Sequence, residues 1–151
     1  MYDKKFEIER NNILKKNSSS KKFLKITKKF NIEASLNQYT YTFNWLGVPI
    51  IQYPQDIILM QELLFEVKPD LIIETGVARA GSLIFYSSIL SLIHKKYKVI
   101  GVDIDIRKHA RKVLKEHKYS KNIKTFEGSS NDKKILSKIS KISKNYKKIL
   151  V

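Results

Sequence analysis

Glu74 and two nearby glycines form the most chemically suggestive cluster in this 151-residue chain. Glu74 follows the apolar residues LII, and Gly76 and Gly81 then enclose a short loop before a second apolar run. Glycines at these positions permit a tight turn and a close approach of the chain at a helix start, where free N–H groups attract ligands. A glutamate beside them would repel a phosphate but attract an amino group or a sulfonium. The cluster therefore favours a cofactor that carries positive charge.

Two common phosphate-binding loops fit the same stretch poorly. The dinucleotide fingerprint G-x-G-x-x-G has Ala78 in place of its middle glycine. A loop ending in Gly-Lys-Ser/Thr would need a lysine where Ser82 follows Gly81. The N–H groups from Val77 to Ser82 are expected to face the ligand. Two alternatives stay open, namely a nicotinamide-dependent enzyme and a glycine turn that only joins a strand to a helix.

A second carboxylate, Asp103, ends the apolar run VIGVD. A carboxylate at the end of the second strand of such a fold is placed to accept hydrogen bonds from ribose hydroxyls. S-adenosylmethionine has a ribose, an amino group and a sulfonium, so it suits both acidic residues. Arg79, inside the loop, is predicted either to reach a cofactor carboxylate or a substrate, or to be a solvent-exposed cation. Asp105 is predicted to cap the next helix or to bond the ribose.

The elements that position these residues alternate between strands and helices, which predicts an α/β fold with a doubly wound, mostly parallel sheet. A helix is expected to begin at Pro54 and to end before Pro69, because proline suits a first helical turn and stops a helix beyond its end. In such sheets, ligands bind beyond the carboxyl ends of the strands. The strands are predicted at 71–75, 97–105, 122–128 and 147–151, and the helices between them at 82–96, 106–117 and 131–145.

The net charge of +16 is unevenly spread. Residues 1–30 hold ten lysines and arginines against three acids, and residues 107–151 hold fifteen against three. Residues 31–106, which carry the loop, hold five against eight. A lysine bias on solvent-facing positions accounts for this pattern, and a basic module that binds or methylates RNA is the alternative.

No metal or disulfide is predicted within the chain. Cysteine is absent, and no secretory signal or membrane-spanning stretch is recognisable, which fits a reducing cytoplasm. The histidines lack acidic or histidine partners at ligand spacing, so surface or capping roles are favoured for His94, His109 and His117.

Residues 1–38 are interpreted as a basic N-terminal extension, partly helical, that precedes a domain at 39–151. Phe23, Ile26 and Phe30 stand at helical spacing among lysines. Such a short amphipathic helix could pack on the domain or lie on a membrane surface, and its small apolar face favours packing. The aromatic stretch at 39–53 is expected to be irregular and to cover an edge of the core.

Three segments, PDLIIETGVARAGSLIFYSSIL, VIGVDIDIR and FEGSS, resemble the cephalosporin hydroxylase family of S-adenosylmethionine-dependent methyltransferases, which includes rhamnosyl O-methyltransferase-like proteins. The resemblance covers about 39–151. It implies a Rossmann-like methyltransferase fold with ribose recognition by Asp103. Contact from Ser129 to the adenine is a further expectation. The other cofactor contacts that it implies are Glu74, Gly76, Ala78, Arg79, Gly81 and Ser82.

The resemblance also implies an activity, namely O-methylation of a small hydroxyl-bearing substrate such as a sugar, a lipid-linked compound or a natural product. A role in lipid or polysaccharide biosynthesis would follow. The family's acidic stretch, associated with a divalent metal and with catalysis, would lie after the fourth strand and beyond Val151. The chain is therefore expected to be a truncated product without its catalytic residues, incomplete after strand four and prone to oligomerise.

Overall fold

The computed structural model describes residues 3–151, which divide after Tyr39 into two compact units. The first unit contains two helices, α1 (Lys4–Ser19) and α2 (Lys21–Leu36). Ser20 separates them, and its hydroxyl accepts a hydrogen bond from the Phe23 N–H at the start of α2. This unit is more helical than the sequence pattern predicted, because residues with high helix propensity, such as lysine and leucine, are frequent on both sides of Ser20.

The second unit, Thr40–Val151, is built on a four-stranded parallel sheet in the order β5-β4-β3-β6. The predicted α/β, Rossmann-like fold is thereby confirmed. The strands are β3 (Leu71–Thr75), β4 (Lys98–Asp103), β5 (Ile123–Glu127) and β6 (Ile149–Leu150). The other elements are η1 (Tyr39–Thr42), the hairpin strands β1 (Asn44–Trp45) and β2 (Val48–Pro49), α3 (Pro54–Val67), α4 (Gly81–Ile93), α5 (Lys108–Glu116), η2 (Lys118–Asn122) and α6 (Lys133–Ser143).

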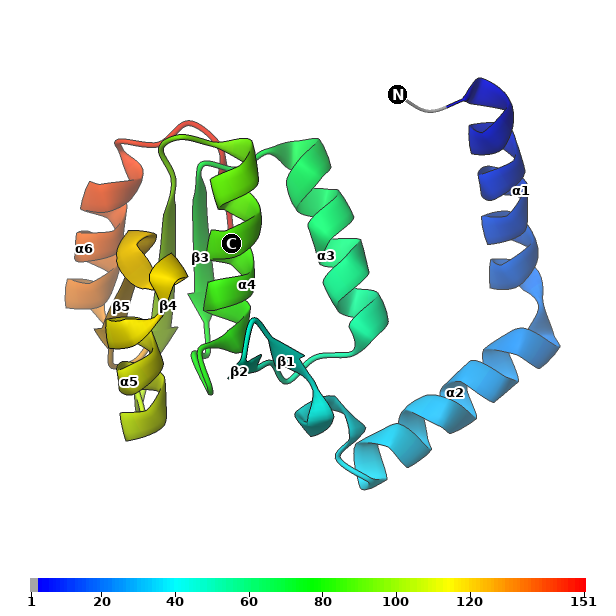
Figure 1. Cartoon of the computed structure of the whole chain (residues 1–151), viewed down its shortest axis with the longest axis horizontal. Coiled ribbons are helices and arrows are strands. Elements are labelled where there is room, and N and C mark those ends of the chain that lie inside the picture. The colour runs from blue at the N-terminus through cyan, green and yellow to red at the C-terminus, as the bar shows by residue number, and fades with distance from the viewer. Residues whose placement is uncertain (1–2) are drawn as a thin grey trace. The chain divides into compact units, whose positions relative to one another are not determined.

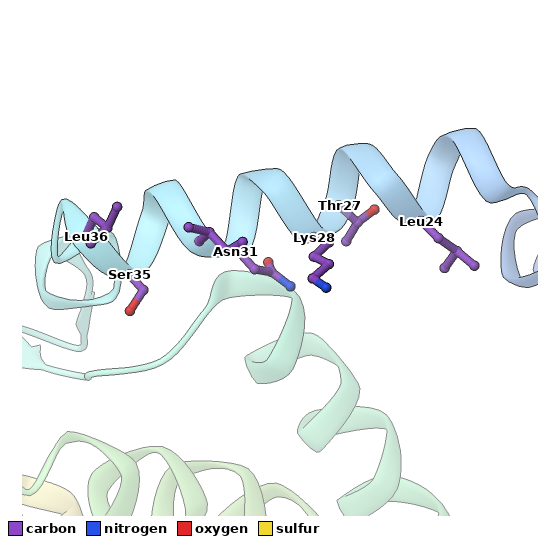
Figure 2. A pocket seen from close by; sticks show the side chains of 7 residues that line it. Leu24, Thr27, Lys28, Asn31, Ser35 and Leu36 are labelled. Carbon is purple, nitrogen blue, oxygen red and sulfur yellow. The ribbon is translucent and has the colours of Figure 1, made fainter.

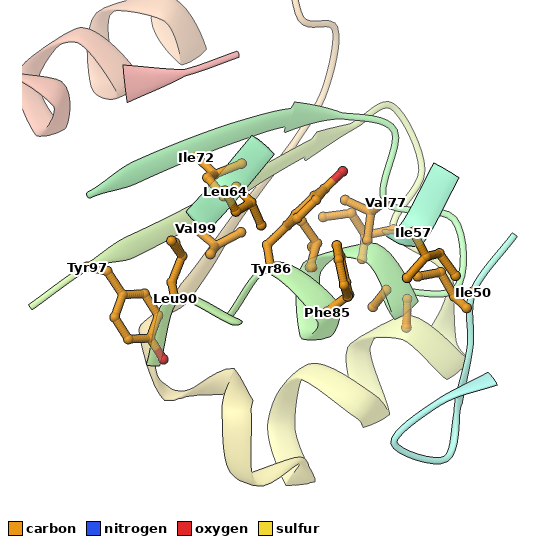
Figure 3. Packing of buried hydrophobic residues seen from close by; sticks show 14 residues of the cluster. Ile50, Ile57, Leu64, Ile72, Val77, Phe85, Tyr86, Leu90, Tyr97 and Val99 are labelled. Carbon is orange, nitrogen blue, oxygen red and sulfur yellow. The ribbon is translucent and has the colours of Figure 1, made fainter. Parts of the chain in front are cut away.

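Helices cover both faces of the sheet (Figure 1). On one face, α3, α4 and α5 pack over the larger core cluster, which includes Leu64, Phe85 and Val99 (Figure 3). On the other face, Ile135 of α6 packs with Ile100 of β4 in a second cluster. Burial on both faces explains why the central strands β3 and β4 read as largely apolar runs in the sequence.

The helix boundaries follow local signals. Pro54 opens α3, and Lys68, with a φ of 51°, ends it immediately before Pro69. Helix α4 ends at Ile93, three residues before the predicted boundary. No helix within residues 3–151 is long and apolar enough to cross a membrane.

Asp70 attaches β6 to the rest of the sheet. Its carboxylate accepts hydrogen bonds from the N–H of Lys147 at 3.0 Å and from the N–H of Lys148 at 2.8 Å. The Lys148 carbonyl in turn accepts from the N–H groups of Asp70 and Leu71. Burial opposes ionisation here, but the backbone donors outweigh it and hold the pKa of Asp70 below its ordinary value. These hydrogen bonds form a clamp at Asp70 that fixes the register of β6 against β3.

Candidate functional site

The loop between β3 and α4 has an unusual backbone. Gly76, Ala78 and Ala80 have φ values of 98°, 44° and 68°, all in the region that favours glycine. For alanine this conformation costs about 1 kcal/mol or more per residue, so the surrounding structure must hold the loop in place. Strain of this kind is concentrated at ligand sites, which makes the loop the first candidate site of the fold.

Asp103, at the end of β4, holds the loop. One of its carboxylate oxygens accepts hydrogen bonds from the N–H of Val77 at 2.7 Å and of Ala78 at 3.2 Å. The other accepts from the N–H of Asp105 at 3.1 Å. Burial opposes ionisation, but these backbone donors outweigh it and lower the pKa of Asp103. Asp103 is therefore an anion that orders the loop, whatever it contacts in a ligand.

These bonds correct the prediction that every N–H from Val77 to Ser82 faces the ligand. Val77 and Ala78 donate to Asp103, and the Ala80 N–H donates to the Val77 carbonyl at 2.7 Å. Within the described residues, the donors left at this end of α4 belong to Arg79, Gly81 and Ser82. The N-cap residue is Ala80, whose methyl side chain cannot accept a hydrogen bond from these N–H groups. The start of α4 thus keeps its partial positive charge available.

Glu74 lies under the same helix start. It accepts a 2.6 Å hydrogen bond from the Ser82 hydroxyl and a 3.2 Å hydrogen bond from the Tyr86 hydroxyl. Burial raises the pKa of Glu74 to about 6, although both hydroxyl donors act in the opposite direction. Burial, together with the Glu74 carboxylate, raises the pKa of Tyr86. Near neutral pH, Glu74 is therefore a largely ionised but poorly solvated carboxylate that would gain from a cationic partner.

The hairpin β1–β2 covers the start of α4. The Trp45 indole N–H donates to the Ser88 hydroxyl at 2.9 Å, and the Trp45 ring packs edge-on against Phe85 with ring centroids 4.8 Å apart. Gly81 has no room for a side chain, because a Cβ there would meet the backbone of Pro49 and Ile50. The aromatic stretch is therefore a packed cover that brings the chain at Gln52 beside the loop.

Three hollows surround the loop at the carboxyl ends of the strands. A hollow of about 140 Å³ is lined by Glu74, Gln52 and Arg79, and one of about 330 Å³ by Arg79, Asp103 and Ile104. A third, of about 230 Å³, is lined by Asp103, Ile104 and Ser129. Because neighbouring hollows share lining residues, they form one depression from β3 to β5, at the edge where ligands bind in open parallel sheets.

The structure thus brings the predicted cofactor residues together. All of them line this depression: Glu74, Gly76, Ala78, Arg79, Gly81, Ser82 and Asp103. Among residues 3–151, no acidic side chain pairs with Arg79. Ser129 also lines the depression, while its hydroxyl accepts a hydrogen bond from the Asn131 N–H at 3.2 Å.

The prediction that Asp105 caps the next helix is wrong. The N-cap of α5 is Arg107, which makes no capping bond, and Asp105 lies 3.8 Å from the Arg107 side chain as an exposed pair. His117 does act as a cap, because its Nδ1 accepts from the Tyr119 N–H. His109 is different, since its buried Nε2 has no hydrogen-bond partner among the described residues.

Sequence reasoning missed Tyr86, Gln52 and Ile104. Tyr86 lies in the second turn of a helix that reads as core, and only its spacing of four residues from Ser82 could have placed both hydroxyls on one side. Ile104 follows Asp103 and remains 78% exposed, so it offers an apolar surface between two hollows. Within residues 3–151, no group of three or more potential metal ligands is present.

Comparison with known proteins gives a family match over most of the chain. The profile of the family Rhamnosyl O-methyltransferase/CmcI matches residues 37–151. The Rhamnosyl O-methyltransferase of Mycobacterium leprae (strain TN) is 35% identical over 63 residues, which are 42% of this chain and 28% of that protein. The same enzyme of Mycobacterium tuberculosis (strain H37Rv) is 27% identical over 103 residues, 68% of this chain and 40% of that protein. The alignments thus span at most two fifths of these relatives.

A solved structure supports the fold. The structure described as "cmcI-D160 Mg-SAM" superposes with a TM-score of 0.50 and 22% sequence identity. The superposition covers 64% of this chain and 40% of that one. At this level of identity, the similarity shows a shared fold.

Proposed function

Because this chain belongs to the Rhamnosyl O-methyltransferase/CmcI family, a family of methyltransferases, we propose that its second unit binds S-adenosylmethionine for methyl transfer to a hydroxyl group. Glu74 carries the proposal, since it is a partly buried, poorly solvated carboxylate at the mouth of the glycine loop. A buried anion is stabilised by a cation and destabilised by a phosphate. S-adenosylmethionine presents an amino group and a sulfonium, whereas a dinucleotide presents a pyrophosphate.

The residues present fit this cofactor. Glu74 would accept from the amino group, and the N–H groups at the start of α4, with Arg79, would face the methionine carboxylate. Asp103 would accept from the ribose with the lone pairs that its loop bonds leave free. Ile104 offers an apolar surface for the adenine, beside Ser129. The cofactor, when bound, would supply an electrophilic methyl group, and the chain's own role here would be to hold and orient it.

For the acceptor, we propose a small molecule with a hydroxyl group, such as a sugar, a lipid-linked compound or a natural product. The names of the relatives, Rhamnosyl O-methyltransferase, support a sugar hydroxyl. The CmcI structure is described as a complex with Mg, so a divalent metal is part of the proposed activity. No residue within 3–151 is proposed as a metal ligand.

Calorimetric titration with S-adenosylmethionine, its demethylated product and NAD tests the proposed function. We expect both methionine compounds to bind at least about tenfold more tightly than NAD, because the loop offers NAD a carboxylate where the pyrophosphate would lie. Tighter binding of NAD would instead favour a nicotinamide-dependent enzyme. If none of the three compounds binds, the proposed cofactor site is wrong.

Cofactor binding is expected to weaken below about pH 6. The pKa of Glu74 is raised from 4.5 to about 6, so its negative charge is lost as the pH falls through this value. An α-amino group has an ordinary pKa of about 8, so the cofactor's cation persists in this range. Affinity should therefore be highest near pH 7, between the two pKa values, and should fall by up to about tenfold per pH unit below about pH 6. Calorimetry across this range measures it.

The free energy of unfolding of the cofactor-free protein should rise as the pH falls, whereas the affinity for the cofactor falls. Because the folded state holds the Glu74 proton more tightly than the unfolded state, Glu74 lowers stability as the pH rises from about 4.5 to 6.

Tyr86→Phe removes one hydrogen-bond donor to the Glu74 carboxylate, so the pH at which half of the cofactor affinity is lost should rise. Tyr97→Phe removes a buried hydroxyl that contacts Ser87 instead, so it serves as the matched control. An unchanged pH profile in Glu74→Gln would exclude Glu74 as the titrating group.

A further inference from the structure

Helix α2 of the first unit is amphipathic. At 3.6 residues per turn, Phe23, Ile26 and Phe30 lie along one face, and their side chains are 50%, 58% and 45% exposed. Ile32 and Leu36 lie on the opposite side. The lysines share that opposite side and its flank, at Lys21, Lys22, Lys25, Lys28 and Lys29.

The charges of α2 are almost all positive. Its 16 residues contain five lysines and one acid, Glu33. Helix α1 adds further basic residues and leaves no residue buried. By helical position, Lys22 and Lys29 border the apolar face on one side. In Figure 2, Leu24 and Lys28 project from the same side of α2, beside Asn31, while Leu36 projects from another side.

This pattern is typical of helices that lie in the headgroup region of a membrane. Such helices have large apolar side chains on one face and lysines on the other. The stems of lysines at the boundary extend along the apolar surface and place their ammonium groups at the level of lipid phosphates. The positive charge is attracted to anionic lipids within about one Debye length of the surface.

We propose that α2 docks on an anionic phospholipid surface, with Phe23 and Ile26 between the headgroups and its lysines toward the phosphates. Phe30 lies on the same face but packs edge-on against Tyr39, with ring centroids 5.7 Å apart. Charge favours this occupant over a second copy of the chain. Each α2 carries five lysines and one acid, so two such helices paired through their apolar faces would repel each other. RNA would match the lysines but would leave the exposed side chains of Phe23 and Ile26 in water.

Vesicle flotation with the full chain tests the proposal. Vesicles of phosphatidylcholine alone are compared with vesicles containing about one third phosphatidylglycerol. We expect binding to the anionic vesicles to be at least about tenfold stronger, and to decline when the salt is raised, because attraction to the lipid charge is screened. Equal binding to both kinds of vesicle, or none to either, would overturn the proposal.

Two double variants separate the faces of α2. Phe23→Ser with Ile26→Ser should weaken binding to anionic vesicles about tenfold, since two large apolar anchors are lost. Ile32→Ser with Leu36→Ser changes two residues that are 52% and 73% exposed on the opposite side, and should leave binding within about twofold. Circular dichroism checks that both variants keep their helix content. Equal losses in the two variants would contradict docking through the Phe23 face.

Sedimentation and RNA titration distinguish the other occupants. A wild-type dimer that dissociates in the variant with Phe23→Ser and Ile26→Ser would show that a second copy covers this face, and would overturn the proposal. Tight, salt-dependent binding to RNA that is unchanged in this variant, together with weak vesicle binding, would identify a nucleic-acid surface instead.

Discussion

A chain with alanine in place of Asp103 is expected to bind S-adenosylmethionine at least about tenfold more weakly and to unfold at a lower urea concentration. The carboxylate accepts hydrogen bonds from Val77, Ala78 and Asp105. Its removal leaves these N–H groups without an acceptor, at a cost of about 1–3 kcal/mol for the partly buried Val77 N–H and less for the two that water can reach. The strained loop then loses the contact that holds it, and the proposed ribose acceptor is lost with it.

Two further variants separate the structural role of Asp103 from its proposed contact with the cofactor. Asp103→Asn keeps one oxygen for the loop but loses the charge, so it should fold and still bind the cofactor weakly. Asp105→Asn changes an exposed carboxylate that lines the same hollow, and it should preserve affinity because the ribose is assigned to Asp103; a loss equal to that of Asp103→Asn would assign the ribose to Asp105 as well. Calorimetry measures the affinity and urea unfolding the stability. If folded Asp103→Asn binds S-adenosylmethionine as tightly as the wild type does, Asp103 is not a cofactor ligand.

The contribution of Asp103 to stability also has a defined pH dependence. Its folded pKa is lower than its ordinary value of 3.8, so the stabilisation is fully present above about pH 4. It is lost as the pH falls through the lower folded pKa, and it does not vary in the range where Glu74 titrates.

Gly81→Ala is expected to lower the free energy of unfolding by about 2–3 kcal/mol and to abolish detectable cofactor binding. The added Cβ would fall on the Pro49 carbonyl oxygen, 2.7 Å from the Pro49 carbonyl carbon and 2.8 Å from the Ile50 Cα. These are backbone atoms, so relief requires movement of the whole hairpin β1–β2. That movement would pull Gln52 away from the loop and disturb the N–H groups at the start of α4.

Leu92→Ala, on the same helix, is the matched control for Gly81→Ala. Leu92 is 82% exposed, so its truncation should change stability by less than about 0.5 kcal/mol. Urea unfolding and calorimetric titration of both variants measure the effects. A Gly81→Ala protein as stable as the wild type would mean that the hairpin does not pack on α4 in solution.

The sheet could be predicted from the sequence because its strands carry strong local signals. The run at 71–75 begins with three apolar residues and is followed by glycines. The local sequence therefore indicates both that this strand is buried and where it ends. The same holds for the strand that ends at Asp103. By contrast, the full extent of the N-terminal helices could not be predicted, because their boundary depends on the cap at Ser20 rather than on apolar periodicity.

The neighbours of Glu74 and Asp103 could not be read from the sequence. Nothing local indicates that the Asp103 carboxylate reaches back to Val77 and Ala78, since this contact depends on the register of β3 against β4. The positive φ of Ala78 and Ala80 runs against the preference of alanine, and only the assembled fold imposes it. The sequence also did not show that α5 begins only at Lys108, with Arg107 rather than Asp105 as its N-cap.

The clamp at Asp70 has a consequence for the order in which the domain assembles. It joins residues 77 and 78 positions apart, whereas the proposed cofactor residues of the loop and of β4 lie between 74 and 103. During synthesis at about 5–20 residues per second, the ribosome needs at least about two seconds to proceed from Asp103 to Lys148. The loop, β3 and β4 can therefore meet before β6 has emerged. Docking of β6 on Asp70 would then be a late step, in which β6 joins a sheet whose loop, β3 and β4 have already assembled.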